Sequence, residues 1–155
     1  MTSFRSLSDQ LAVGGQPTVD DLHRLRAQGF ATVVDLRLPD EAGEPLDPAA
    51  EGAAAAERGL GYRHLPVALD ELEPAVVERL RQEIRASPGP VYVHCGAGQR
   101  ACSLTLLATG DKLATVGDDL IAQAADLGFP VTDARLATFI KELSERERVT
   151  LQQAI

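Results

Sequence analysis

The chain has few of the residues that build disulfide scaffolds or metal sites. Its 155 residues include two cysteines, Cys95 and Cys102, and three histidines. Two cysteines in a chain without a secretion signal are typical of free thiols in a reducing compartment. They are too few for a structural zinc site without help from histidine, and the histidines do not show metal-ligand spacing. We therefore expect no disulfide framework, no metal and no cofactor.

Long apolar runs and excess positive charge are also lacking. No apolar run approaches the roughly 20 residues that a membrane-spanning helix needs, and residues 1–10 contain no long apolar segment of a signal peptide. Acidic residues outnumber basic ones by 23 to 15, for a formal net charge of −8. Such a surface argues against nucleic acid or an anionic membrane as the main partner. These absences predict a cytoplasmic protein with neither kind of partner.

What is present is an alternation of apolar runs rich in β-branched residues with amphipathic segments. This alternation predicts an α/β fold with a largely parallel sheet covered by helices on both faces. At this length we expect a single domain over residues 1–155, with a charged tail that frays from about residue 144. The predicted strands cover about residues 11–13, 30–36, 61–67 and 90–93, and the predicted helices about 16–28, 48–58, 74–86, 100–109, 116–127 and from 132 onward.

One stretch, residues 94–100, has the composition of a reactive site. It follows a predicted strand and precedes a predicted helix, and its sequence is His-Cys-Gly-Ala-Gly-Gln-Arg. The unpaired amides of a helix start carry positive partial charge, and glycine lets several N–H groups converge on one anion. This field and a nearby arginine favour the thiolate form of a cysteine. We predict that Cys95 is the nucleophile and that an anion binds to the segment formed by Gly96, Ala97, Gly98, Gln99 and Arg100.

Other polar residues at predicted strand ends have supporting roles in this interpretation. We expect His94 to bond to backbone behind the loop, as structural support rather than as a general base. Asp70 follows a strand end and is the candidate general acid, with Glu71 and Glu73 as competitors and a solvated acidic loop as the alternative. Asp35 and Arg37 either order the crevice or form an ion pair there. Cys102 is expected to be a core residue, with a resolving thiol as the less favoured alternative.

Four segments together resemble a known family. They are 14–18 (Gly-Gly-Gln-Pro-Thr), 33–37 (Val-Val-Asp-Leu-Arg), the cysteine stretch, and 121–129 (Ile-Ala-Gln-Ala-Ala-Asp-Leu-Gly-Phe). In these segments the chain resembles the phosphatase-like domain of beta-lactamase-hydrolase-like proteins. The resemblance covers nearly the whole chain and implies the architecture of dual-specificity and tyrosine phosphatases. Some members of the family are linked to sulfide metabolism and others are described as phosphatases, so the resemblance leaves the reaction open.

The spacing within the cysteine stretch bears on the reaction. Four residues separate Cys95 from Arg100, one fewer than in the loop of protein tyrosine phosphatases, which wraps the oxygens of a phosphate. The order Cys-x-x-Gly-x-Arg instead resembles the loop of rhodanese sulfurtransferases, in which the thiolate carries a sulfane sulfur as a persulfide. The shorter loop favours sulfur transfer.

Three functions follow from these observations. The first is transfer of sulfur from thiosulfate or a persulfide through a Cys95 persulfide to an acceptor thiol. The second is hydrolysis of phosphate monoesters through a phosphocysteine, with Asp70 as the acid. The third is a non-catalytic module that binds an anion or a persulfide. All three predict a small anionic ligand, and the first two predict a cysteine-dependent enzyme.

Overall fold

The computed structural model describes residues 3–41, 46–110 and 117–154, and within them it confirms the predicted α/β fold. The strands form one sheet in the order β1-β2-β5-β3-β4, in which β1 is antiparallel to β2 and the other neighbours are parallel. The strands are β1 (Phe4–Ser8), β2 (Leu11–Gly14), β3 (Thr32–Asp35), β4 (Gly61–His64) and β5 (Val91–His94). The helices are α1 (Val19–Ala27), α2 (Pro48–Glu57), α3 (Pro74–Ala86), α4 (Gln99–Thr109), α5 (Gly117–Asp126) and α6 (Ala134–Ala154).

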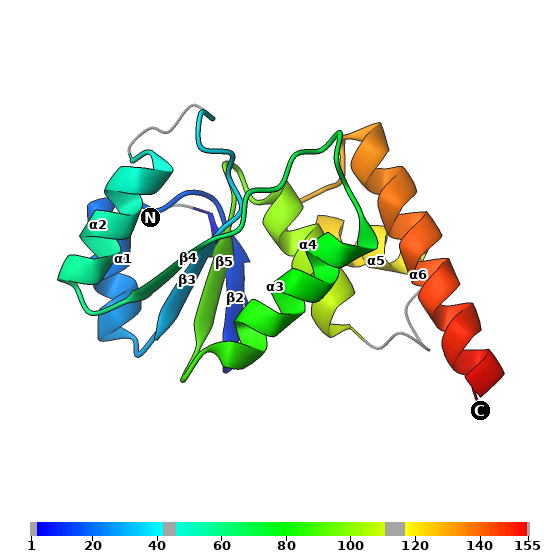
Figure 1. Cartoon of the computed structure of the whole chain (residues 1–155), viewed down its shortest axis with the longest axis horizontal. Helices are drawn as coiled ribbons and strands as arrows, with labels where there is room; N and C mark the ends of the chain where they lie inside the picture. The colour runs from blue at the N-terminus through cyan, green and yellow to red at the C-terminus, as the bar shows by residue number, and fades with distance from the viewer. Residues whose placement is uncertain (1–2, 42–45, 111–116, 155) are drawn as a thin grey trace.

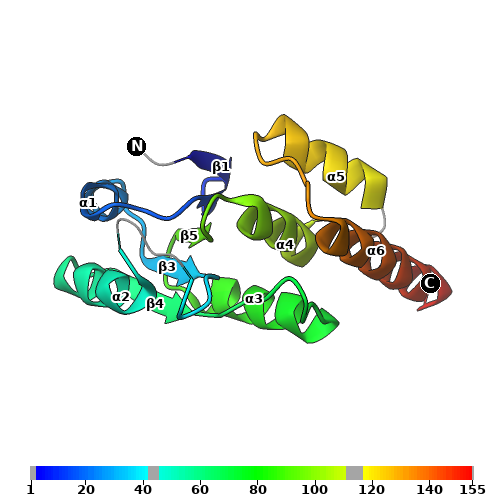
Figure 2. The ribbon, with the colours of Figure 1, turned by 90° about the horizontal axis from the view of Figure 1, so that it is seen from above.

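Side chains of the strands alternate between two apolar layers, as the pleat of a sheet buried on both faces requires. In β5, Val91 and Val93 belong to one layer and Tyr92 to the other. Helices α1 and α2 cover the Tyr92 face, whereas α3 and α4 cover the opposite face (Figures 1 and 2). Helices α5 and α6 pack against α4 as an outer layer. Helix α4 is therefore buried from Ala101 to Ala108.

Local sequence signals explain why the first two helices begin where they do. Thr18 caps α1: its hydroxyl accepts the N–H of Asp21, whose carboxylate accepts the N–H of Thr18, both at 3.0 Å. This reciprocal pair satisfies two amides that a helix start leaves unpaired. Asp47 caps α2 by accepting the N–H of Ala50 at 2.8 Å, and Pro48 occupies the first turn, where its missing N–H costs nothing.

The structure differs from the sequence-based expectations at element ends. Strand β1 is not expected from its sequence, because Phe-Arg-Ser-Leu-Ser has few apolar residues and lies at the edge of the sheet. Strand β4 ends at His64 rather than at residue 67, since Pro66 has no N–H for the ladder. The predicted start of a helix at residue 116 lies outside the described residues. Helix α6 continues to Ala154. Within the described ranges, no helix combines the length and the apolar character needed to cross a membrane.

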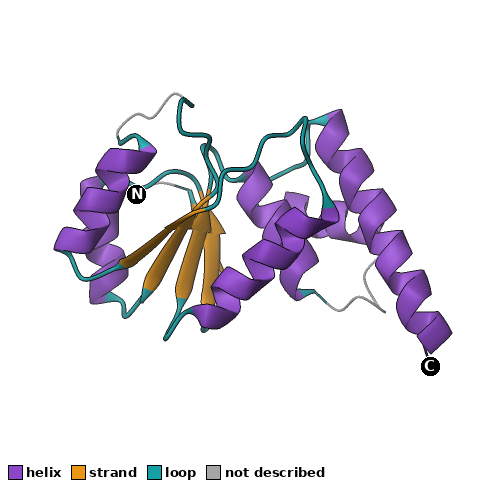
Figure 3. Cartoon of the chain, in the orientation of Figure 1, coloured by secondary structure: helices purple, strands orange, loops and turns teal. Residues whose placement is uncertain are grey.

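The parallel strands bring their carboxyl ends to one edge of the sheet. Figure 3 shows the strand arrows ending at this edge, where the loops that follow them gather. Strand β5 lies between β2 and β3, so Cys95, the next residue, is at the middle of this edge. In open parallel sheets this edge is where ligands bind.

Candidate active site

Backbone amides close around the sulfur of Cys95. The Sγ atom accepts hydrogen bonds from the N–H of Gly98 at 3.1 Å and from the N–H of Ala101 at 3.5 Å. Both donors belong to the start of α4, whose N-cap is Gly98. The side chain is 1% exposed, so these contacts are shielded from bulk water. Amides at a helix start favour a negative charge in their vicinity, so the start of this loop is electrostatically suited to an anion.

Gly98 is required by the shape of this loop. Its φ of +110° lies in the left-handed region, which L side chains rarely adopt. A Cβ atom at this position would lie 2.3 Å from the ring of Phe129. The ring belongs to the segment between α5 and α6, so the outer helical layer packs directly on the cysteine loop. The second glycine of the motif thus serves both the backbone turn and this close approach.

A cavity of about 440 Å³ opens above the cysteine. Its walls come from the loops that follow three parallel strands and from the start of α6. Lining residues are Leu38, Glu41, Val67, Ala68, Leu69, Asp70, Cys95, Ala97, Gln99, Arg100 and Arg135. Asp70 is therefore in the same cavity as Cys95, whereas among the described residues neither Glu71 nor Glu73 lines it. The geometry is compatible with a general acid at Asp70, and this role stays a prediction.

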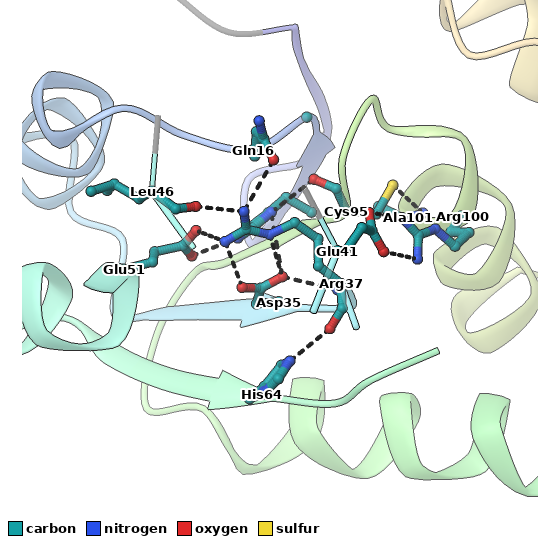
Figure 4. A network of polar contacts seen from close by, with 12 residues as sticks. Gln16, Asp35, Arg37, Glu41, Leu46, Glu51, His64, Cys95, Arg100 and Ala101 are labelled. Carbon is teal, nitrogen blue, oxygen red and sulfur yellow. Dashed lines mark hydrogen bonds and ion pairs between the residues drawn. The ribbon is translucent and has the colours of Figure 1, made fainter. Parts of the chain in front are cut away.

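Arg100, the predicted anion clamp, is held by a carboxylate. Its Nη1 and Nη2 atoms donate to the two oxygens of Glu41 at 2.9 and 2.5 Å, and Nη1 also donates to the carbonyl of Val67 at 3.0 Å. The Arg100 and Glu41 side chains are 13% and 25% exposed. Figure 4 shows this pair beside the Cys95 sulfur. A carboxylate thus already occupies the arginine that the sequence assigns to a substrate anion.

The charges of this pair reinforce each other. Burial would lower the pKa of Arg100, but the hydrogen bond to Glu41 and the charge of Cys95 raise it above its ordinary value. Burial would likewise raise the pKa of Glu41, but the hydrogen bond from Arg100 and the N–H of Leu38 lower it. Both groups are therefore charged at neutral pH.

His94 contacts the backbone of the cysteine loop, as the sequence analysis expects of a structural residue. Its Nδ1 lies 3.1 Å from the carbonyl oxygen of Cys95. A carbonyl oxygen only accepts, so Nδ1 carries a proton. Its Nε2 lies 2.6 Å from a carboxylate oxygen of Glu51, within hydrogen-bond distance. Burial raises the pKa of Glu51, although His94 and Arg37 oppose the shift. His94 is fully buried, and among the described contacts it reaches Cys95 through the carbonyl oxygen of that residue.

Arg37 joins the loops at the centre of a buried polar network (Figure 4). It donates to Asp35 at 3.0 and 3.1 Å, to Glu51 at 2.9 Å and to the side chain of Gln16 at 3.0 Å. The pair that the sequence expects between Asp35 and Arg37 is thus present. Burial would raise the pKa of Asp35, but Arg37 and the charge of His94 lower it. The network fixes the loop after β3 against the base of the cysteine loop.

Three buried groups of this network have the donor types of a metal site. Ligand atoms of Asp35, Glu51 and His94 lie within 4.8 Å of one another. The guanidinium of Arg37, however, donates to both carboxylates. A fixed cation therefore already occupies the position between them, and the trio does not fit a metal ion.

Gln99 and Gly96 have contacts that the sequence does not reveal. The side-chain oxygen of Gln99 accepts the N–H groups of Thr132 at 2.9 Å and Asp133 at 3.1 Å. Gln99 therefore caps the start of α6, although it also lines the cavity. Gly96 lies next to Glu41. A Cβ atom added to Gly96 would lie 3.2 Å from the carboxylate of Glu41. Anion binding by residues 96–99 stays a prediction.

Cys102 has the environment of a core residue. It is fully buried in α4, and burial together with the charge of Cys95 raises the pKa of its thiol to about 12. A thiol with this pKa has almost no thiolate at neutral pH. This supports the predicted core position over the alternative of a resolving thiol.

Sequence reasoning missed the residues that lie far from the motif along the chain. Glu41, Glu51 and Arg135 each contact the site from a different loop or helix. Glu51 lies in an Ala-rich helix and has the pattern of a surface residue, yet it is fully buried. The available signal was the charged pair Asp35 and Arg37 at the end of a buried strand, because buried charges need partners.

Comparisons with known proteins agree with the fold. Residues 3–114 match the family described as the beta-lactamase hydrolase-like protein, phosphatase-like domain. A beta-lactamase hydrolase-like protein of Agrobacterium fabrum is 35% identical over 109 residues, which is 69% of this chain and 24% of that protein. The chain therefore spans about a quarter of that relative's length.

Two solved structures resemble the whole chain. A candidate phosphatase of Neisseria meningitidis has a TM-score of 0.74 at 24% identity, covering 92% of this chain and 96% of that one. A P. aeruginosa TpbA variant in complex with phosphotyrosine has a TM-score of 0.71 at 17% identity, covering 97% and 91%. At these identities the likeness shows the fold. None of these four matches is named for sulfur transfer, so they give the predicted preference for that reaction no support. Since the family match covers most of the chain and the cysteine loop lies within it, this chain belongs to the phosphatase-like domain family of beta-lactamase hydrolase-like proteins.

Proposed function

We propose that this domain is a sulfurtransferase in which Cys95 carries the transferred sulfur. The observation that carries the proposal is the short loop between Cys95 and Arg100, whose amides of Gly98 and Ala101 lie at 3.1 and 3.5 Å from Sγ. The two amides bond to the Cys95 sulfur itself, and in this short loop the same donors would serve the outer sulfur of a persulfide. A tetrahedral phosphate needs a wider ring of donors to bind its oxygens.

The charge around the cysteine supports the same proposal. Glu41 pairs with Arg100 through both oxygens and lies close to Gly96. A phosphate monoester is a dianion at neutral pH, and its oxygens would meet this carboxylate at close range. A persulfide donor presents a terminal sulfur with a single charge and is repelled less than either a phosphate monoester or thiosulfate, which is also a dianion. This charge argument therefore favours a persulfide as the donor, with thiosulfate as a test substrate. The paired Arg100 still contributes positive charge to the loop, since its pKa is raised.

The reaction has two balanced steps. The Cys95 thiolate attacks the outer sulfur of thiosulfate, an S–S bond forms, and sulfite leaves with the electron pair of the broken bond. With a persulfide donor the leaving group is a thiolate. An acceptor thiolate or cyanide then attacks the terminal sulfur of the Cys95 persulfide and regenerates the Cys95 thiolate. Neither leaving group needs a proton, so the first step requires no general acid.

Phosphate monoester hydrolysis is the second candidate, and the position of Asp70 favours it. This carboxyl group lines the cavity above Cys95, where a phosphatase needs an acid to protonate the leaving oxygen. Cys95 would attack phosphorus, the ester oxygen would leave as an alcohol, and water would cleave the phosphocysteine. The solved structures of similar fold are described as phosphatase proteins or contain phosphotyrosine.

One paired assay decides between the candidates. The purified domain receives thiosulfate with cyanide in one reaction and an aryl phosphate in another, and thiocyanate and phosphate are measured. Thiocyanate formation that is lost in Cys95→Ser and kept in Cys102→Ser is the expected result. Phosphate release without thiocyanate would replace the proposal by hydrolysis, and Asp70→Asn would then test the acid. No turnover that depends on Cys95 in either reaction would leave a module that only binds anions.

A further inference from the structure

A second cavity lies beside the one above Cys95. It has a volume of about 550 Å³ and follows the first turns of α6. Its lining residues are Leu69, Asp70, Leu72, Ala134, Arg135, Thr138, Phe139 and Glu142. Leu69, Asp70 and Arg135 line both cavities, so the two are adjacent. A volume of this size is typical of sites for small organic ligands, whereas thiosulfate alone has no organic part to fill it.

The start of α6 is fixed to the cysteine loop at two points. Gln99 accepts the N–H groups of Thr132 and Asp133, and its side-chain nitrogen donates to the hydroxyl of Thr132 at 3.2 Å. The ring of Phe129 packs against Gly98. These contacts hold the first turn of α6 at a set position relative to the reactive sulfur. Any group that this turn presents is therefore placed for a ligand that reaches Cys95.

Arg135 is the group that this turn presents. Asp133 holds two of its nitrogens, Nε at 3.1 Å and Nη2 at 2.8 Å. Within the described part of the chain, its Nη1 makes no hydrogen bond or ion pair, and the side chain is 56% exposed. The hydrogen bond from Arg135 lowers the pKa of Asp133 to about 2, so the pair persists at neutral pH. The guanidinium is thus oriented and retains a donor for an incoming carboxylate.

The rest of the second cavity complements a zwitterion with an apolar stem. Leu69, Leu72 and Phe139 supply apolar surface, and Asp70 and Glu142 supply two carboxylates. We propose, on the basis of the proposed sulfur transfer, that this cavity binds the organic body of an amino-acid-type persulfide. Its carboxylate pairs with Arg135, its ammonium faces the carboxylates, and its terminal sulfur reaches Cys95. Asp70 then serves in binding and not in proton transfer.

Donor preference tests this inference. The wild-type domain and Arg135→Gln receive either cysteine persulfide or the persulfide of 2-mercaptoethanol, which lacks both charges. The preference for cysteine persulfide, as a ratio of kcat/KM values, is expected to fall about five-fold in Arg135→Gln, the size of an exposed ion pair. The loss should appear in KM and not in kcat. Arg146→Gln, on an exposed part of the same helix, is the matched control and should keep the ratio.

A binding measurement separates failure of this inference from failure of the proposed function. S-methylcysteine cannot transfer sulfur. Calorimetry measures its affinity for the Cys95→Ser variant and for the double variant that carries both Cys95→Ser and Arg135→Gln. About five-fold weaker binding in the double variant supports the second cavity even if no sulfur transfer is detected. Equal affinities, no binding at all, or an unchanged donor ratio would overturn the inference.

Discussion

Glu41 and a substrate anion compete for the same guanidinium, and this competition gives a quantitative prediction. Glu41→Gln removes the charge but keeps an oxygen that can accept the N–H of Leu38. Because Arg100 then loses its ionic partner, it is free to pair with an incoming anion. We expect thiosulfate to bind the Cys95→Ser protein more tightly when Glu41 is replaced.

The magnitude follows from the geometry of the pair. Exposed ion pairs contribute about 0.2–1 kcal/mol, and hydrogen bonds to charged groups about 1.5–3 kcal/mol. The Arg100–Glu41 pair has two such bonds, at 2.9 and 2.5 Å, and is mostly shielded from water. A value of about 1–2 kcal/mol corresponds to roughly five- to thirty-fold tighter binding.

Calorimetric titration of thiosulfate at fixed ionic strength measures this change. Asp40→Asn is the matched control, since it removes one negative charge from an exposed neighbour of Glu41. The control should change the affinity far less than Glu41→Gln does. Unchanged or weaker binding in Glu41→Gln would refute the reasoning and would make Glu41 a residue that positions Arg100 for the anion.

The pH dependence of this binding has a defined sign. Because Arg100 and the N–H of Leu38 lower the pKa of Glu41, the competing carboxylate stays ionised from neutral pH down to below its ordinary pKa. The gain from Glu41→Gln should therefore be constant over the neutral range. It should shrink only when the pH falls through the lowered pKa of Glu41.

Further predictions concern the support of the loop. Cys102→Ala should keep full turnover in a sulfur-transfer assay, since its pKa of about 12 makes the thiol unreactive, and a large loss of kcat would contradict the core assignment. Gly98→Ala should lower the free energy of unfolding by about 2–4 kcal/mol, because its Cβ would meet Phe129; an unchanged Tm would contradict this. Arg37→Leu should lower the free energy of unfolding by about 3–5 kcal/mol at neutral pH, measured by urea denaturation. The loss should be smaller in acid, where Asp35, which has lost its arginine partner, becomes protonated.

The architecture was predictable because its signals are local. Apolar runs with β-branched residues mark β3 and β5, and turn glycines mark helix ends. The cysteine loop was predictable for the same reason, since strand, turn and helix start are contiguous in the sequence. Strand β1 was not predictable, because its structure depends on pairing with β2 at the sheet edge and not on an apolar pattern of its own.

The site was predictable only along the motif. Glu51 pairs with His94 across 43 positions of the chain, and Glu41 pairs with Arg100 across 59. Glu41 lies in an acidic stretch and Glu51 in an Ala-rich helix, and both segments resemble a solvated surface. Only the folded sheet edge brings the two carboxylates to the loop. Gln99 shows the same limit, because its place in the motif suggests an anion ligand while its side chain caps α6.

The central claim is that Cys95 holds a transferred sulfur, and the intact mass of the protein tests it most directly. The domain is incubated with thiosulfate, freed of small molecules without a reducing agent, and measured by mass spectrometry. A species heavier by one sulfur atom, absent in Cys95→Ser, lost after cyanide and present in Cys102→Ser, is the predicted result. No sulfur adduct with thiosulfate or a persulfide, together with a phosphate adduct on Cys95 after an aryl phosphate, would contradict the account.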